Sequence, residues 1–266
     1  MRKIAIVGFK GGIGKTTTCV SLGAALARQG KRVLLIDTDT QANVSISLGL
    51  DEVKHSLADV LAHKIPAKDA LVPARKSLDL IPASLGLFKA QQRMVLEMAR
   101  EEVFKDLLVD LPDYDYQILD CAPSATLLTV NAIAYVEEVF IPVSMEMLAL
   151  AGARQFMTYL RTVSRLLGSG GVIRLIIPTM FDSRRRVSGR VLQSLKKDFG
   201  HRVTKPIRVD TQLSEAPGVG RTIFEYAPNS RGAKDYTALA KVVDDMPPLD
   251  LNHRDTNSDS DDEESQ

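Results

Sequence analysis

The chain has 266 residues, of which 45% are hydrophobic and 25% are charged, close to the averages for folded soluble domains. This composition argues against a chain that is disordered throughout, and the length allows a full hydrophobic core in one large or two small domains. The sequence has two cysteines without a CxxC pair and no run of about 18 apolar residues, so it predicts no disulfide framework, zinc site or membrane span.

The formal net charge of +1 conceals an uneven distribution along the chain. Residues 250–266 carry seven acidic side chains and one arginine, a net charge of −6, whereas residues 1–249 carry 33 basic and 26 acidic side chains, a net charge of +7. The basic body favours polyanionic partners. We expect a folded domain over residues 1–248 and a disordered acidic tail over residues 249–266, where Asp, Ser, Asn and Glu predominate.

Short segments rich in Val, Ile and Leu recur along the chain, and patterns typical of amphipathic helices separate most of them. The first helical pattern stops at Gly30, and later patterns cover residues 155–167 and 231–246. Continuous apolar strands that alternate with helices predict an α/β fold, with a mostly parallel twisted sheet of about seven or eight strands and helices on both faces. The predicted strands are residues 3–8, 32–37, 78–83, 116–121, 138–143, 172–178 and 206–209.

The stretch FKGGIGKTTT, residues 9–18, lies between the first predicted strand and the first predicted helix. Glycines at this point let backbone N–H groups turn toward one anion, and the start of the helix adds a partial positive charge. We expect Lys15 to pair with the β and γ phosphates of a nucleotide, Thr16 to bind Mg²⁺ and Thr17 to contact the α phosphate. The residues assigned to this phosphate site are Gly11, Gly12, Ile13, Gly14, Lys15, Thr16 and Thr17.

A strict GxxxxGK(S/T) pattern fails in this loop, because Phe9 stands where the first glycine should be. From Lys10 onward the sequence KGGIGKTT resembles the deviant Walker A loop of the ParA/MinD family of P-loop ATPases. The resemblance implies a single-domain P-loop NTPase fold, ATP as the ligand and weak ATP hydrolysis. It also implies that Lys10 reaches across a homodimer interface to the partner's ATP, where a second cation stabilises the closed state. A solvated loop lysine is the alternative for Lys10.

Two aspartates follow the second predicted strand in LLIDTDTQANVS and should lie at the carboxyl edge of the sheet, beside the phosphate loop. The segment is similar to the DxDPQxN motif of the family, with Thr40 in place of the proline. The resemblance implies that Asp39 orients the attacking water and that Asp37 lies near Mg²⁺. Aspartates that only cap a turn or a helix are the alternative.

A third aspartate, Asp120, ends the apolar segment YDYQILD. The segment is similar to the Walker B strand of the family, which continues D-x-P-P-S, with Ala122 in place of the first proline. The resemblance implies that Asp120 holds the water shell of Mg²⁺, because this ion prefers hard oxygen ligands. A helix-capping aspartate is again the alternative.

Further matches extend the resemblance over nearly residues 1–245. The segment LSEAPGVGRTIFEYAPNSRGAKDYTALA, from residue 213, is similar to the end of Soj-like chromosomal and small-plasmid ParA proteins rather than that of MinD. In such proteins the adenine base is held at the ends of the last two strands. This implies contacts to the base around Thr179, Met180 and Asp210.

A cluster of arginines in DSRRRVSGR marks the start of a predicted helix. Arginines at one end of an exposed helix can contact DNA phosphates without reading the base sequence, although a solvated charged helix is the alternative. Two basic positions that the family often uses for DNA are absent from the segment 209–212, and two other arginines are expected to compensate. The candidate DNA contacts are Arg184, Arg185, Arg186, Arg190, Arg208 and Arg221.

The resemblance implies a partition ATPase whose ATP-bound homodimer binds double-stranded DNA non-specifically and is released when a ParB-like adaptor stimulates hydrolysis. Such a protein would be cytoplasmic and associated with the nucleoid, and its cargo would be plasmid or chromosome DNA. Positioning of a protein cargo such as carboxysomes is the main alternative. A MinD-like membrane ATPase is disfavoured because the acidic tail would be repelled by anionic lipid, and a metal-cluster carrier would need paired cysteines. We therefore expect no membrane partner.

Overall fold

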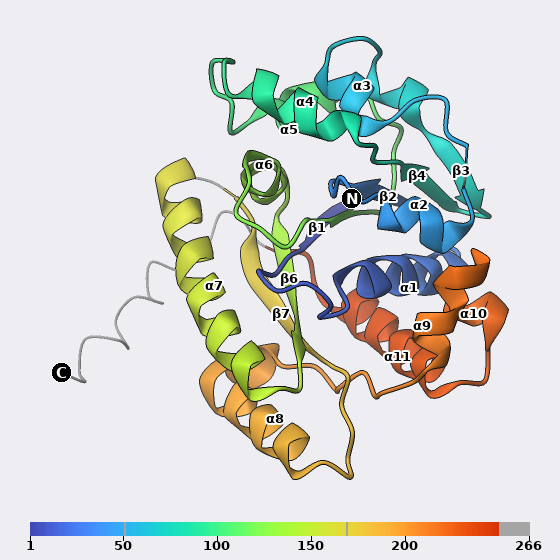
Figure 1. The fold of residues 1–266 in the computed structure, drawn as a ribbon, viewed down its shortest axis with the longest axis vertical. Coiled ribbons are helices and arrows are strands. Elements are labelled where there is room, and N and C mark those ends of the chain that lie inside the picture. Colours follow the sequence, from blue (N-terminus) through green and yellow to red (C-terminus); the bar gives the residue numbers. More distant parts are fainter. Residues whose placement is uncertain (51, 169, 250–266) are drawn as a thin grey trace.

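The computed structural model describes residues 1–50, 52–168 and 170–249 (Figure 1). The acidic tail predicted for residues 249–266 therefore lies, from residue 250 on, outside the described residues. The strands are β1 (Arg2–Ile6), β2 (Val33–Asp37), β3 (Val72–Arg75), β4 (Leu78–Ile81), β5 (Tyr116–Asp120), β6 (Glu138–Ser144) and β7 (Val172–Thr179).

Helices connect most of these strands. The α-helices are α1 (Lys15–Arg28), α2 (Asn43–Leu48), α3 (Leu57–Leu61), α4 (Gly86–Met94), α5 (Val103–Leu107), α6 (Leu127–Tyr135), α7 (Met147–Leu167), α8 (Arg186–Phe199), α9 (Gln212–Glu215), α10 (Ile223–Tyr226) and α11 (Arg231–Asp245). Three short 3₁₀ turns add η1 (Ala67–Ala70), η2 (Gly200–Arg202) and η3 (Ala216–Val219).

The seven described strands form one sheet in the order β3-β4-β2-β5-β1-β6-β7. Every neighbouring pair is parallel except β3 and β4, which run antiparallel at one edge. Parallel strands need crossover connections, and these are the helices on the two faces. The α/β P-loop NTPase fold predicted from the sequence is thus confirmed.

Two apolar layers form the core, one on each face of the sheet. Neighbouring residues of β1 point to opposite faces, so that Ala5 packs in one layer and Ile4 and Ile6 pack in the other. Figure 1 shows α1, α2, α10 and α11 on one face and α3 to α7 on the other, and α8 packs against α7. Because both faces are covered, the middle of each central strand is apolar, as in Ile4–Ile6 of β1 and Val33–Ile36 of β2.

The pairing register brings three strand ends together. Ile6 of β1 pairs with Asp120 of β5, and Asp120 pairs with Asp37 of β2. The loop after β1 therefore begins beside both aspartates. This is the carboxyl edge at which open α/β sheets bind their ligands.

Two strand predictions differ from the structure. Residues 206–209 were predicted as a strand, but they form only an isolated bridge between Phe181 and Arg208. Pro206 begins this segment and cannot donate to a ladder. Conversely, β3 was not predicted, because its sequence VPAR is short and contains a proline, which an edge strand tolerates.

The helix α1, which carries the phosphate-loop lysine, is fastened to α11 by a buried hydrogen bond. The hydroxyls of Thr18 and Tyr236 lie 3.0 Å apart, and both side chains are almost fully buried.

We expect Tyr236→Phe to lower the free energy of unfolding by about 1 kcal/mol, because the Thr18 hydroxyl loses its partner. Urea denaturation measures this change. The control Tyr226→Phe removes an exposed phenol bound to Glu215 and should change stability by less than about 0.5 kcal/mol; equal effects would contradict the assignment.

Candidate nucleotide site

The phosphate loop runs from β1 to α1 and turns on two glycines. Gly12 has a φ of 72° and Gly14, the N-cap of α1, has a φ of 88°. Side chains with a Cβ rarely adopt such left-handed values, so glycine is required at these two positions. A loop of this shape lets successive N–H groups surround one anion at the start of a helix.

Lys15 spans the inside of this loop. Its Nζ donates a hydrogen bond to the carbonyl oxygen of Lys10 at 3.1 Å, and the side chain is buried. Burial lowers the pKa of Lys15, while the nearby Asp120 carboxylate acts in the opposite direction. The ammonium is thus held next to the glycines before any ligand arrives.

Thr16 and Asp120 form the contact expected of a magnesium site. The Thr16 hydroxyl donates to Asp120 Oδ2 at 2.6 Å, and Asp120 Oδ1 has no hydrogen-bond partner among the described residues. Burial raises the pKa of Asp120 to about 7, while the Thr16 hydrogen bond and the charge of Lys15 oppose that rise. A buried carboxylate oxygen beside a hydroxyl is a hard donor pair that fits Mg²⁺.

The ion would need further ligands. The described part of the chain holds no group of three or more His, Cys, Asp or Glu side chains that could enclose a metal alone. Mg²⁺ commonly binds one or two protein oxygens together with nucleotide phosphates and water. The pair Thr16 and Asp120 therefore fits an ion that enters with a nucleotide.

The two aspartates after β2 have different surroundings. Asp37 is fully buried, and its two oxygens accept the N–H groups of Asp39 at 3.0 Å and Val44 at 3.1 Å. Burial, with a contribution from the charge of Asp120, raises the pKa of Asp37 well above its usual value. Asp37 thus ties down the start of α2, and its predicted place near Mg²⁺ stays a prediction. Asp39 is only partly buried and accepts the N–H of Gln41 at 3.0 Å.

A cavity of about 600 Å³ opens over the phosphate loop. It brings together the predicted Gly11, Gly12, Gly14, Lys15, Thr16, Thr17 and Asp39. Its other lining residues are Thr40, Gln41, Asn43, Ile46, Ser47, Ala122, Pro123, Ser124 and Pro217. The wall formed by Ile46, Ser47 and Pro217 was not predicted from the sequence. The i,i+4 spacing of Asn43 and Ser47 could have indicated one helix face, but no pattern placed Pro217 there.

Four predicted nucleotide contacts, Ile13, Thr179, Met180 and Asp210, do not line this cavity. The side chain of Ile13 is buried, and its carbonyl oxygen accepts a hydrogen bond from the Thr179 hydroxyl at 2.8 Å. Met180 follows β7 directly, with an exposed side chain and a φ of 54°. The oxygens of Asp210 accept the N–H groups of Gln212 and Gly232. A role of Met180 and Asp210 at the base stays a prediction.

Lys10 lies on the rim of the loop and does not line the cavity. Its Nζ lies 2.7 Å from Glu146 Oε2, at the start of α7, and both side chains are about half exposed. The hydrogen bond from Lys10 lowers the pKa of Glu146. Glu146 was not predicted as a site residue, since only the fold brings it to the loop.

The candidate DNA contacts fall into two groups. Arg184, Arg185, Arg186 and Arg190 are exposed at the start of α8, and Arg208 is joined to this region by its bridge to Phe181. Arg221 lies apart, just before α10, which Figure 1 shows well away from α8.

Two of these arginines are already paired. Arg184 binds Asp182 at 2.9 Å, and Arg208 binds Asp235 at 2.7 Å. No ion pair holds Arg186 or Arg190 within the described ranges. Arg185 is also exposed and forms no ion pair among the described residues, so three guanidinium groups at the start of α8 are available to bind a phosphate.

None of the described helices is both long and apolar enough to cross a bilayer.

Comparisons with known proteins agree with this geometry. A family model described as an AAA domain matches residues 1–169. The chain is 41% identical over 245 residues to the sporulation initiation inhibitor protein Soj of Bacillus subtilis, covering 90% of this chain and 97% of that protein. It is 37% identical over 253 residues to the chromosome partitioning protein ParA of Caulobacter vibrioides, covering 91% and 94%.

Solved structures share the fold. One is a cobyrinic acid a,c-diamide synthase of Mycobacterium smegmatis with a bound ATP analogue and magnesium, with a TM-score of 0.79, 31% identity and coverage of 91% of this chain and 94% of that chain. Another is the septum site-determining protein MinD of Pyrococcus horikoshii with Mg-ADP, with a TM-score of 0.76, 27% identity and coverage of 92% and 96%. Both neighbours carry the ligands predicted from the sequence, an adenine nucleotide and magnesium.

Binding of Mg²⁺ with ATP is expected to release protons below about pH 7. Burial raises the pKa of Asp120 to about 7, and a divalent cation favours the ionised carboxylate, so a proton must leave as the ion binds. The affinity should therefore rise from about pH 6 to about pH 8, by at most roughly tenfold per pH unit. Calorimetry in two buffers of different ionisation enthalpy counts the protons.

The matched control is Asp120→Asn with the same MgATP solution, which retains the ionisation of the nucleotide but lacks the titrating carboxyl. Fewer protons should be released by this variant at about pH 6. Equal proton release by the two proteins would contradict the assignment of Asp120.

Proposed function

Because the chain belongs to the ParA/Soj family of partition ATPases, we propose that it acts as a switch that binds DNA as an ATP-bound homodimer and releases it on hydrolysis. The family activity is hydrolysis of ATP with Mg²⁺ as cofactor. The observation that carries the proposal is the different placement of two loop lysines. Lys15 lines the cavity and is buried, whereas Lys10 is half exposed outside it.

The residues that line the cavity can divide the work of phosphoryl transfer with Asp120, which does not line the cavity but accepts a hydrogen bond from the lining residue Thr16. Lys15 and the loop N–H groups would bind the β and γ phosphates, and Thr16 and Asp120 would hold Mg²⁺. When bound, the ion neutralises charge on the phosphate oxygens. Asp39 also lines the cavity, and its carboxylate can accept a proton from a water molecule and orient it. Orientation and charge neutralisation suffice for slow hydrolysis, because phosphoryl transfer needs little covalent chemistry from the protein.

Lys10 would complete the site of a second copy of the chain. In the single chain its ammonium is bound to Glu146, and Lys10 does not line its own cavity. Bound MgATP adds phosphate oxygens that can compete for this cation when two copies meet face to face. ATP would then hold the dimer together, and hydrolysis would weaken it.

The start of α8 is the proposed DNA surface. Its exposed arginines can bind phosphates without reading sequence, and two copies in one dimer double the number of phosphates that can be bound. A dimer that forms only with ATP would therefore bind DNA only with ATP. A ParB-like adaptor would stimulate hydrolysis and so release the dimer, and the protein would work in the cytoplasm on the nucleoid.

The cargo is proposed to be plasmid or chromosome DNA. The relative from Caulobacter vibrioides is a chromosome partitioning protein, which favours DNA over a protein assembly such as a carboxysome. Both cargoes would use the same switch and would differ in the adaptor that stimulates hydrolysis.

Lys10→Ala is expected to abolish ATP-driven dimerisation while leaving nucleotide binding by the single chain nearly unchanged, because Lys10 does not line its own cavity. Sedimentation velocity with a non-hydrolysable ATP analogue and Mg²⁺ measures the dimer. The control Lys64→Ala removes an equally exposed lysine that is paired with Asp59 and should dimerise normally. A Lys10→Ala protein that dimerises like the wild type would refute the proposed role.

DNA binding tests the function itself. Affinity for non-specific duplex DNA should appear with ATP and fall steeply with salt, and it should be weak with ADP or without nucleotide. The double variant Arg186→Ala, Arg190→Ala should reduce the slope of log affinity against log salt by about 0.9 for each phosphate that the protein no longer neutralises. The matched control is the double variant Lys64→Ala, Lys89→Ala, which removes two exposed positive charges from the region of α3 and α4, shown in Figure 1 well away from α8. DNA affinity that does not depend on the nucleotide would overturn the switch.

A further inference from the structure

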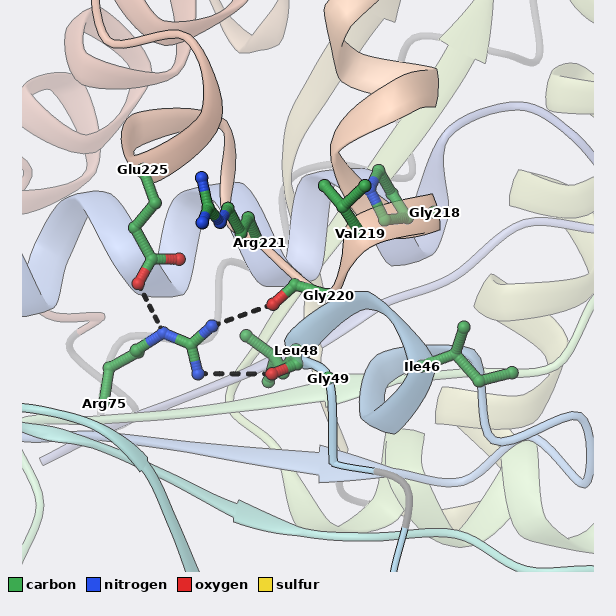
Figure 2. Close-up of a pocket in the computed structure, with 10 residues that line it drawn as sticks. Ile46, Leu48, Gly49, Arg75, Gly218, Val219, Gly220, Arg221 and Glu225 are labelled. Atoms are coloured by element: carbon green, nitrogen blue, oxygen red, sulfur yellow. Dashed lines mark hydrogen bonds and ion pairs between the residues drawn. The ribbon is translucent and has the colours of Figure 1, made fainter.

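Figure 2 shows the residues that line a second cavity, of about 740 Å³. Its lining comes from α2, from the segment 217–221 and from Arg75 and Glu225. Ile46 and Pro217 line both cavities. The α2 helix and the η3 turn therefore form a thin partition, with the candidate ATP site on one side and Arg75 on the other.

The partition is held together by contact between two glycines. Gly49 ends α2 with a φ of 67°, and Gly220 ends η3 with a φ of 63°. A Cβ added to Gly220 would lie 2.6 Å from the Cα of Gly49, a distance that real Cβ atoms do not show. The two backbones thus touch directly, and nothing larger than hydrogen fits between them.

Arg75 links the ends of both elements by hydrogen bonds. Its Nη1 donates to the carbonyl oxygen of Leu48 at 3.2 Å, and its Nη2 donates to that of Gly220 at 2.9 Å. Its Nε donates to Glu225 Oε1 at 2.6 Å, which fixes the plane of the guanidinium group, as Figure 2 shows. Carbonyl groups at helix ends lack partners within the helix and carry partial negative charge, so a forked cation suits them.

The α2 helix depends on such contacts. It has six residues, too few for a helix to be stable in water by itself. Its beginning is fixed by the hydrogen bond from Val44 N–H to Asp37, and its end by the hydrogen bond from Arg75 to Leu48. The loop that carries Asp39 leads directly into this helix.

We propose that Arg75 is a positioning residue of the nucleotide site, which fastens α2 to η3 and thereby fixes the wall that faces the phosphate loop. It acts through the backbones of Leu48 and Gly220 and touches neither nucleotide nor Mg²⁺. The inference rests on the proposed assignment of the cavity to ATP, and it is independent of DNA binding and of dimerisation.

The test compares Arg75→Ala with Lys76→Ala, which removes the same charge from the next, exposed position. Both are made in the Lys10→Ala protein, so that dimerisation does not contribute. Affinity for MgATP by calorimetry should fall roughly tenfold for Arg75→Ala and stay unchanged for Lys76→Ala. Hydrogen exchange without nucleotide should accelerate in residues 43–50 and 216–222 of Arg75→Ala, and not in the rest of the chain.

Arg75→Lys is the second variant, and it serves if Arg75→Ala does not fold. An ammonium keeps the charge but lacks the fork that bonds both carbonyls, so an intermediate loss of affinity and local exchange in the same two segments are expected. Unchanged affinity and exchange in the Arg75 variants, or accelerated exchange spread over the whole chain, would overturn the positioning role. Failure of the wild-type chain to bind MgATP would instead refute the assignment of the cavity to ATP.

Discussion

The register of three parallel strands is the constraint on which the site depends. Asp120 sits between Ile6 and Asp37 because β5 lies between β1 and β2, and a shift of one residue would turn its carboxylate to the other face. The same register starts the phosphate loop beside the aspartate that must share an ion with Thr16. Packing of the aliphatic core on both faces holds this register, so apolar residues determine where the charged groups of the site lie.

Burial at this edge has an electrostatic consequence. Asp37 and Asp120 lie close together in a buried environment, and the pKa values of both carboxyls are raised, chiefly by loss of solvent. Two backbone N–H groups donate hydrogen bonds to Asp37 and stabilise its ionised form. Asp120 accepts one hydrogen bond, from Thr16, and is otherwise stabilised only by the charge of the nearby Lys15. The less satisfied carboxylate is the one that gains most from a divalent cation. The carboxylate with the fewest hydrogen-bond donors therefore lies at the position where Mg²⁺ would bind.

How far the sequence could predict this structure depends on the range of the interactions involved. Local patterns were sufficient to predict the phosphate loop, α1 and the central strands. Glycines between a strand and a helix determine the backbone conformation of the loop, and short apolar runs mark the strands. The prediction of residues 206–209 as a strand was wrong although the end of β7 lies beside them, because Pro206 has no N–H to donate and the segment forms only an isolated bridge. Glu146 and Pro217 were missed because each reaches the site only through tertiary packing of distant segments.

The wall of the nucleotide cavity shows why such residues escape detection. Ile46 and Pro217 belong to two short elements of low intrinsic stability, and neither carries a motif of phosphate chemistry. Their positions follow from backbone contact between Gly49 and Gly220 and from one guanidinium group behind them. A site built in this way has a rigid side, formed by the phosphate loop on the sheet, and a side whose position depends on a few hydrogen bonds. Because the loop with Asp39 leads into the second side, small displacements there would move Asp39 as well as weaken nucleotide binding.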